Sequence, residues 1–206
     1  LEPVGTEFGT DTPPQGPTRI TVRAWLVMVG SATTAMAGLS VFVVSGSWLD
    51  DAFGVSTGGV GAVAMLFGAT ELVSSLGSAA FADRLGKLRT TLGGLGALLA
   101  GLAVMISADA RLWIGIVGIV VFLLGFELAF VVSLSLVSES MPNARGTTLA
   151  ASNAVGTVAR ASGAVLSGWL YGIHGIAGTA VLSAAAAAVA VMTLLLSRRP
   201  SLAAAR

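Results

Sequence analysis

Long apolar runs separated by short polar stretches make up most of this chain. A helix of about 20 apolar residues spans the roughly 30 Å hydrocarbon core of a bilayer, since each residue adds about 1.5 Å. The runs do not alternate apolar and polar residues as transmembrane β-strands do. The pattern therefore predicts six membrane-crossing helices, over residues 24–44, 59–82, 91–106 with flanking residues, 112–137, 147–171 and 177–196.

The composition also favours a lipid environment. Hydrophobic residues make up 55% of the chain and charged residues 10%, whereas soluble domains carry about 25% charge. The chain has no cysteine and a single histidine, which excludes disulfides, thiolate chemistry and cysteine-based metal sites. We therefore predict an all-α membrane protein without a cofactor or a metal, whose main partner is the lipid bilayer, and we expect no nucleic-acid partner.

The ends of the chain differ from its apolar centre. Residues 1–21 are rich in glycine, proline and acidic residues, which is typical of a flexible linker. We predict a cytoplasmic linker over 1–21, a six-helix bundle over 22–197 and a cytoplasmic tail over 198–206. Because the chain opens with Leu1 and a linker-like segment, we expect it to be a fragment with an upstream partner.

Basic residues gather on one side of the predicted bundle if the helices alternate in direction. That side holds Arg19, Arg23, Arg84, Lys87, Arg89, Arg145, Arg198, Arg199 and Arg206. The opposite side holds Arg111 alone, beside acidic residues. Basic loops stay in the cytoplasm, so both termini are expected there. The expected location is a bacterial plasma membrane.

Three ionisable residues fall inside predicted spans: Glu71, Glu127 and Arg160. Each lies roughly 15–20 Å from the cytoplasmic end of its helix at about 1.5 Å per residue, so all three are expected near the bilayer midplane. A charge there costs at least about 2.5 kcal/mol, which favours side chains that face protein or water. The sequence therefore predicts a polar site at mid-membrane.

Two of these residues lie on polar or small stripes of their helices. Glu71 shares a face with serines 74, 75 and 78, and Arg160 shares one with Asn153, Thr157 and several small residues. One interpretation is a substrate and proton cavity, in which a glutamate exchanges its pairing with Arg160 for a proton. The other is a fixed ion pair between Arg160 and either glutamate, which only locks the helices together.

Small residues at four-residue spacing predict close helix contacts. They are Gly93, Ala97 and Gly101 in the third run and Ser152 and Gly156 in the fifth. A chain this rich in glycine and alanine also produces such spacing by chance, so both interpretations stay open.

The connection between the second and third runs reads AAFADRLGKLR over residues 79–89. Gly86 permits a tight turn there, and Asp83 can accept N–H groups from a helix N-terminus. The segment resembles the G-x-L-A-D-R-x-G-R-K signature of the major facilitator superfamily, through Asp83, Arg84, Gly86 and Lys87. The leading glycine is replaced by Ala79, and the second basic residue is displaced to Arg89. Residues 67–73, 125–130 and 138–147 resemble the sugar and drug efflux branch of that superfamily.

The resemblance implies a C-terminal six-helix half, itself a 3+3 inverted repeat, whose missing N-terminal six-helix half completes the carrier. It also implies a mid-membrane substrate cavity lined by the first, second, fourth and fifth helices. Asp83 would serve a cytoplasmic gate, with Glu139 and Arg145 as charged neighbours. The expected function is proton-coupled efflux, by antiport, of a small organic molecule that is a sugar or drug-like.

Two alternatives come from other classes. A complete small six-helix protein could dimerise as a carrier or serve as a scaffold that does not transport. An intramembrane protease needs a Gly-x-Ser-Gly serine and a histidine from another helix. Here Arg160 stands where glycine is needed before Ser162, and His174 follows only twelve residues later. We therefore expect no enzyme.

Overall fold

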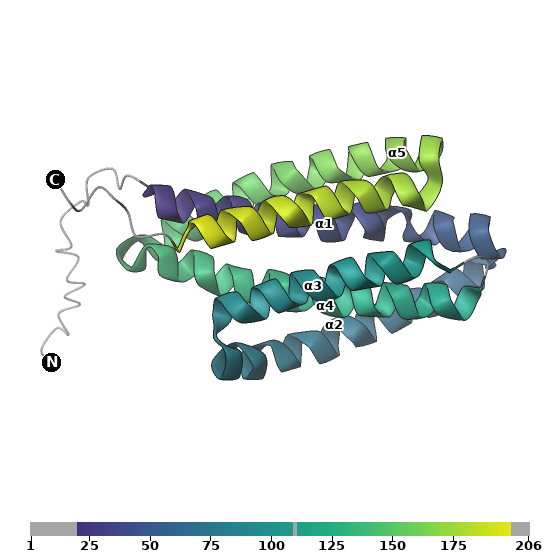
Figure 1. Ribbon diagram of the computed structural model, residues 1–206, viewed down its shortest axis with the longest axis horizontal. Coiled ribbons are helices and arrows are strands. Elements are labelled where there is room, and N and C mark those ends of the chain that lie inside the picture. The colour runs from purple at the N-terminus through teal and green to yellow at the C-terminus, as the bar shows by residue number, and fades with distance from the viewer. Residues whose placement is uncertain (1–19, 109–110, 199–206) are drawn as a thin grey trace, which may run out of the picture.

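The computed structural model of this chain describes residues 20–108 and 111–198. Helices account for nearly all of the described chain, and they run side by side as an elongated bundle (Figure 1). They are α1 (Val22–Phe53), α2 (Thr57–Leu85), α3 (Lys87–Ile106), α4 (Leu112–Ser140), the short 3-10 helix η1 (Pro142–Ala144) and α5 (Arg145–Leu196). In the described part, five helices are long and apolar enough to cross a membrane. The predicted all-helical class is therefore confirmed.

The longest helix, α5, reverses direction at Gly175. That residue has φ 58° and ψ −151°, a backbone conformation that only glycine adopts readily. The Thr179 hydroxyl oxygen lies 3.5 Å from the Ser167 carbonyl oxygen, whereas 12 residues of straight helix would extend about 18 Å. Figure 1 shows the resulting hairpin. We call residues 145–174 the first arm and residues 176–196 the second arm.

The two arms of α5 correspond to the fifth and sixth predicted runs. The structure therefore agrees with the sequence on where the apolar segments lie, although two of them form one hairpin helix. Six separate membrane crossings remain a prediction.

The helices extend beyond the predicted runs because capping groups, rather than the edge of the apolar stretch, set their ends. Thr21 caps α1 by accepting a hydrogen bond from the Ala24 N–H at 3.2 Å, and Gly54, with φ 64°, ends it. Ser56 caps α2 through the Gly59 N–H at 3.3 Å. As a result α1 continues through residues 45–53, which are too polar to be read as membrane-spanning.

Helices α3 and α4 pack at backbone distance because glycines face each other across their contact. A Cβ added at Gly94 would lie 2.7 Å from the Ala129 backbone nitrogen, and one added at Gly118 would lie 2.8 Å from that of Met105. Gly101 is equally restricted by the Phe122 backbone, as its spacing predicted. Gly93, in contrast, is exposed, and a Cβ added there would have no neighbouring atom within 4 Å, so that part of the prediction is wrong.

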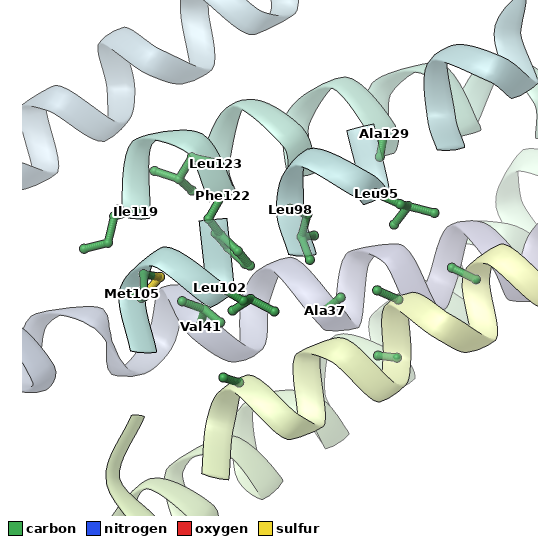
Figure 2. Packing of buried hydrophobic residues seen from close by; sticks show 14 of the residues in the cluster. Ala37, Val41, Leu95, Leu98, Leu102, Met105, Ile119, Phe122, Leu123 and Ala129 are labelled. Atoms are coloured by element: carbon green, nitrogen blue, oxygen red, sulfur yellow. The ribbon is translucent and has the colours of Figure 1, made fainter. Parts of the chain in front are cut away.

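The hydrophobic core lies between α1, α3, α4 and the second arm of α5. Figure 2 shows Val41 of α1, Leu102 and Met105 of α3, and Ile119 and Phe122 of α4 directed toward one another. All five side chains are at most 3% exposed. Burial of such side chains, together with close backbone contact, holds helices together where lipid competes for apolar surface.

Helix α1 is joined to both arms of α5 through serine hydroxyls. The Ser183 hydroxyl donates to the Ala37 carbonyl at 2.8 Å, and the Ser167 hydroxyl donates to the Ser40 carbonyl. These bonds link three helical segments around residues 37–40, in the middle of α1. Buried polar groups are satisfied in this way without water.

The outermost helix is α2, which lies along the edge of the bundle away from α5 (Figure 1). It packs mainly on α4, where the Ser74 hydroxyl donates to the Leu124 carbonyl at 3.2 Å. Its large apolar side chains are open on the outer surface, with Met65 79% and Leu76 74% exposed. Lipid or another protein must cover this face.

The domain predictions are only partly covered by the described residues. Of the linker predicted for 1–21, only Ile20 and Thr21 are described, and of the tail predicted for 198–206, only Arg198. The start of α1 and the end of α5 lie at the same end of the bundle (Figure 1). The side of the membrane on which that end lies remains a prediction.

Candidate functional site

A cavity of about 310 Å³ lies between α1, α2, α4 and the first arm of α5. We call it the central cavity. Its ionisable lining residues are Glu71 from α2, Glu127 from α4 and Arg160 from the first arm. All of its lining residues come from the four helical segments that the family resemblance named. The structure thus brings together the three charges that the sequence placed at one depth.

The depth of the three charges follows from their positions along the helices. Glu71 lies at the midpoint of α2, Glu127 just past the midpoint of α4, and Arg160 at the midpoint of the first arm. Helices of this length span the bilayer with residues to spare at both ends, so their midpoints lie near its centre. The central cavity therefore lies at mid-bundle, at the depth that the sequence predicted for the three charges.

Four phenylalanines form the apolar walls of the central cavity. Phe42 and Phe67 lie with ring centroids 5.9 Å apart, and Phe126 and Phe130 are stacked at 5.6 Å. Gly38 makes this possible, because a Cβ there would collide with the Phe126 ring. These walls were not predicted from the sequence. The sequence feature that could have indicated them is the four-residue spacing of Phe126 and Phe130, which places both on one helix face.

Arg160 forms no ion pair with either glutamate within the described ranges. The one ion pair found there joins Lys87 and Glu139. The Arg160 guanidinium instead donates to the Thr157 hydroxyl at 3.1 Å, on its own helix. The fixed pair considered from the sequence is therefore not formed in this conformation. Two carboxylates and one guanidinium face the same space.

Asn153 lies outside the central cavity. It lines a neighbouring cavity of about 250 Å³ with Ser31, Ser152 and Gly156. Arg160 lines both spaces, so its side chain stands between them. A long, flexible cation at such a boundary can reach groups on either side.

The signature loop is a tight turn stabilised by two features. Gly86, with φ 84°, ends α2 and begins α3, and the Thr90 hydroxyl donates to the Phe81 carbonyl at 3.0 Å across the turn. Lys87 then reaches α4 to pair with Glu139. The other predicted gate residues are exposed and form no ion pair within the described residues: Asp83, Arg84, Arg89 and Arg145. Their role in a gate remains a prediction.

The residues considered for a protease cannot act together. Ser162 and His174 lie on the same helical arm, about 18 Å apart along its axis at 1.5 Å per residue. A nucleophile and its base need hydrogen-bond distance. This pair does not form a catalytic dyad.

Comparison with known protein families places this chain. The family model described as Major Facilitator Superfamily matches residues 27–206, which include every lining residue of the central cavity and the whole signature loop. The curated proteins contain no match to this chain. Members of that family are membrane transporters, and their helices lie in the bilayer. With the match covering most of its length, this chain belongs to the major facilitator superfamily.

Proposed function

We propose that this chain is the C-terminal half of a secondary transporter that exports an apolar organic cation in exchange for protons. The observation that carries the proposal is the central cavity, where Glu71, Glu127 and Arg160 meet at mid-bundle from three different helical segments. Ionisable residues at that depth are costly, and they mark substrate or ion pathways. The family of the chain provides the general activity, transport across a membrane.

The walls of the central cavity favour a drug-like molecule over a sugar. Apart from the three ionisable residues, every lining residue has an apolar side chain or is glycine, and four are phenylalanines. A sugar needs several hydrogen-bonding partners, since each unpaired hydroxyl in a dry site costs free energy. Aromatic faces instead attract apolar cations. With both carboxylates ionised, the site has one negative charge in excess.

Proton coupling follows from competition for a carboxylate. Since neither glutamate is held in an ion pair with Arg160, each is available to a proton or to a cationic substrate. Protonation removes the charge that attracts the substrate. Alternating occupancy of this kind exchanges protons for substrate. The likeness of residues 67–73 and 125–130 to the efflux branch favours export as the direction of transport.

The exposure of Glu71 supports a missing partner half. This side chain lies at the midpoint of α2, yet it is open on the surface of the bundle. A carboxylate facing acyl chains at that depth is strongly disfavoured, so protein or a water-filled space is expected over it. A six-helix N-terminal half would provide both. A second copy of this chain, in a symmetric carrier, remains the alternative.

The remaining predictions fit this arrangement. Six crossings, with the two arms of α5 as the fifth and sixth, would form a 3+3 inverted repeat. Both termini would then share one side of the membrane, and the basic loops favour the cytoplasm of a bacterial cell.

The test is transport by the full-length protein that contains this chain, in everted membrane vesicles. In these vesicles efflux becomes uptake, and an acidic interior drives it. Ethidium, an aromatic cation, is expected to accumulate until a protonophore collapses the gradient, whereas glucose is not. Glu127→Gln should abolish gradient-driven ethidium uptake, while Asp50→Asn, at the end of α1, should retain it. Uptake of glucose instead, or ethidium uptake that ignores the gradient, would contradict the proposal.

A further inference from the structure

A separate cavity of about 300 Å³ opens at the end of the bundle where α1 begins and α5 ends. We call it the end pocket. Its charged lining residues are Arg23 from α1, Lys87 from α3, Glu139 from α4 and Arg198 after α5. These residues are far apart in the sequence, and the chain folds them into one space. Apart from the predicted gate role of Lys87 and Glu139, the proposed transport cycle does not use this pocket.

The end pocket has an excess of positive charge. Three of its lining residues are basic and one is acidic, and the single carboxylate, Glu139, is already paired with Lys87. Within the described ranges Arg23 and Arg198 take part in no ion pair. Two guanidinium groups around one small space repel each other unless an anion lies between them. The charge pattern therefore favours an anionic ligand.

The backbone adds to the positive character of the end pocket. Helix α3 begins here at Lys87, its N-cap residue Gly86 supplies no side-chain cap, and its first turn contains no acidic residue. An uncapped helix start presents N–H groups and the positive end of the helix dipole. The two serine hydroxyls of the pocket are already bonded, Ser140 to the Val137 carbonyl and Ser197 to the Leu194 carbonyl, both at 2.7 Å. Recognition of an anion is thus left to the basic side chains and the start of α3.

The position and the floor of the end pocket identify the kind of anion. All four charged residues lie within two residues of a helix end, which is the level of lipid head groups for a membrane-crossing bundle. The pocket continues inward along Val27, Leu88 and Leu136. A basic rim above an apolar floor matches an amphipathic ligand with a phosphate at one end.

We propose that the end pocket binds the phosphate of an anionic phospholipid. The two arginines and Lys87 hold the head group, and one acyl chain lies along Val27, Leu88 and Leu136. Bound in this way, the lipid bridges the start of α1, the α3–α4 ion pair and the end of α5. Phosphatidylglycerol is the simplest probe of this class.

The test is native mass spectrometry of the protein that contains this chain, released from mixed micelles with equal amounts of phosphatidylglycerol and phosphatidylcholine. The protein should retain phosphatidylglycerol in preference. Each of Arg23→Gln and Arg198→Gln should lower that retention about fivefold, the effect of one basic charge near a lipid surface. Arg89→Gln, on the same end outside the pocket, and Arg111→Gln, at the opposite end, should leave it unchanged. Equal loss in the controls would overturn the site.

Glu139→Gln separates electrostatic binding from general loosening of the bundle. It removes the negative charge of the end pocket, so phosphatidylglycerol retention should rise about fivefold, although the ion pair with Lys87 is lost. A fall in retention would contradict the proposal. Inorganic phosphate, added in excess, should displace little lipid because it lacks the acyl chain. Full displacement at equal concentration would assign the pocket to free phosphate and overturn the lipid assignment.

Discussion

The Tyr171 hydroxyl donates a hydrogen bond to the Asp51 carboxylate at 2.7 Å, at the end of the bundle opposite the end pocket. The bond joins the last turns of α1 to the first arm of α5, close to the reversal at Gly175. Together with the Lys87–Glu139 ion pair at the other end, it ties the helices at both ends of the bundle.

Tyr171→Phe should lower the free energy of unfolding by about 1 kcal/mol, because it removes this hydrogen bond and keeps the ring. Asp51→Asn should cost less, since the amide oxygen still accepts the bond. Unfolding in mixed detergent, followed by helix signal, measures both. A loss of several kcal/mol of unfolding free energy in Tyr171→Phe would contradict the modest contribution expected of a hydrogen bond at the surface of the bundle.

The glycines of α3 make a matched pair for testing helix contact. Gly101→Ala places a methyl group against the backbone of α4, so it should destabilise the bundle by about 1–3 kcal/mol through overpacking. Gly93→Ala adds the same group on the same helix where a Cβ has nothing within 4 Å, and should leave stability unchanged or slightly higher. The two unfolding curves give the comparison. Equal curves would contradict the contact described here.

Gly175 should be the least replaceable glycine of α5. Its φ of 58° with ψ −151° is strained for any residue with a Cβ, so Gly175→Ala should cost about 1–3 kcal/mol or open the hairpin. Gly172→Ala, three residues earlier in regular helix, is the control and should be neutral, because a Cβ added there, as at Gly175, has no neighbouring atom within 4 Å. A disulfide introduced across the two arms would report an opened hairpin by forming more slowly.

Much of this architecture could be predicted from the apolar runs and the positions of charge. The six runs correspond to α1–α4 and the two arms of α5, and the depths of Glu71, Glu127 and Arg160 followed from counting residues. Both predictions depend on bilayer thickness and helix rise, which are the same for every membrane helix.

What could not be predicted depends on which helices touch. Helical spacing gave Gly101 but also Gly93, since only the position of α4 decides which face of α3 is buried. In the same way the phenylalanine walls of the central cavity could not be predicted from α4 alone, because they require Phe42 and Phe67 from two other helices. The end pocket joins residues from Arg23 to Arg198, a contact that no local pattern contains.

Substitution of Arg160 distinguishes the two interpretations that the sequence left open, a substrate and proton cavity and a fixed ion pair. A fixed, buried ion pair would make Arg160→Gln destabilising by about 3–5 kcal/mol, because a buried carboxylate would lose its partner. Among the described residues the Arg160 guanidinium donates only to Thr157 on its own helix, which predicts a loss of about 1 kcal/mol or less. The same variant should change transport strongly, since its charge faces the central cavity, whereas Arg111→Gln should affect neither property. Unfolding and ethidium uptake, measured on the same preparations, distinguish the cases. A large stability loss that Glu127→Gln, in the double variant, restores would show that the pair forms after all and that its role is to lock the helices.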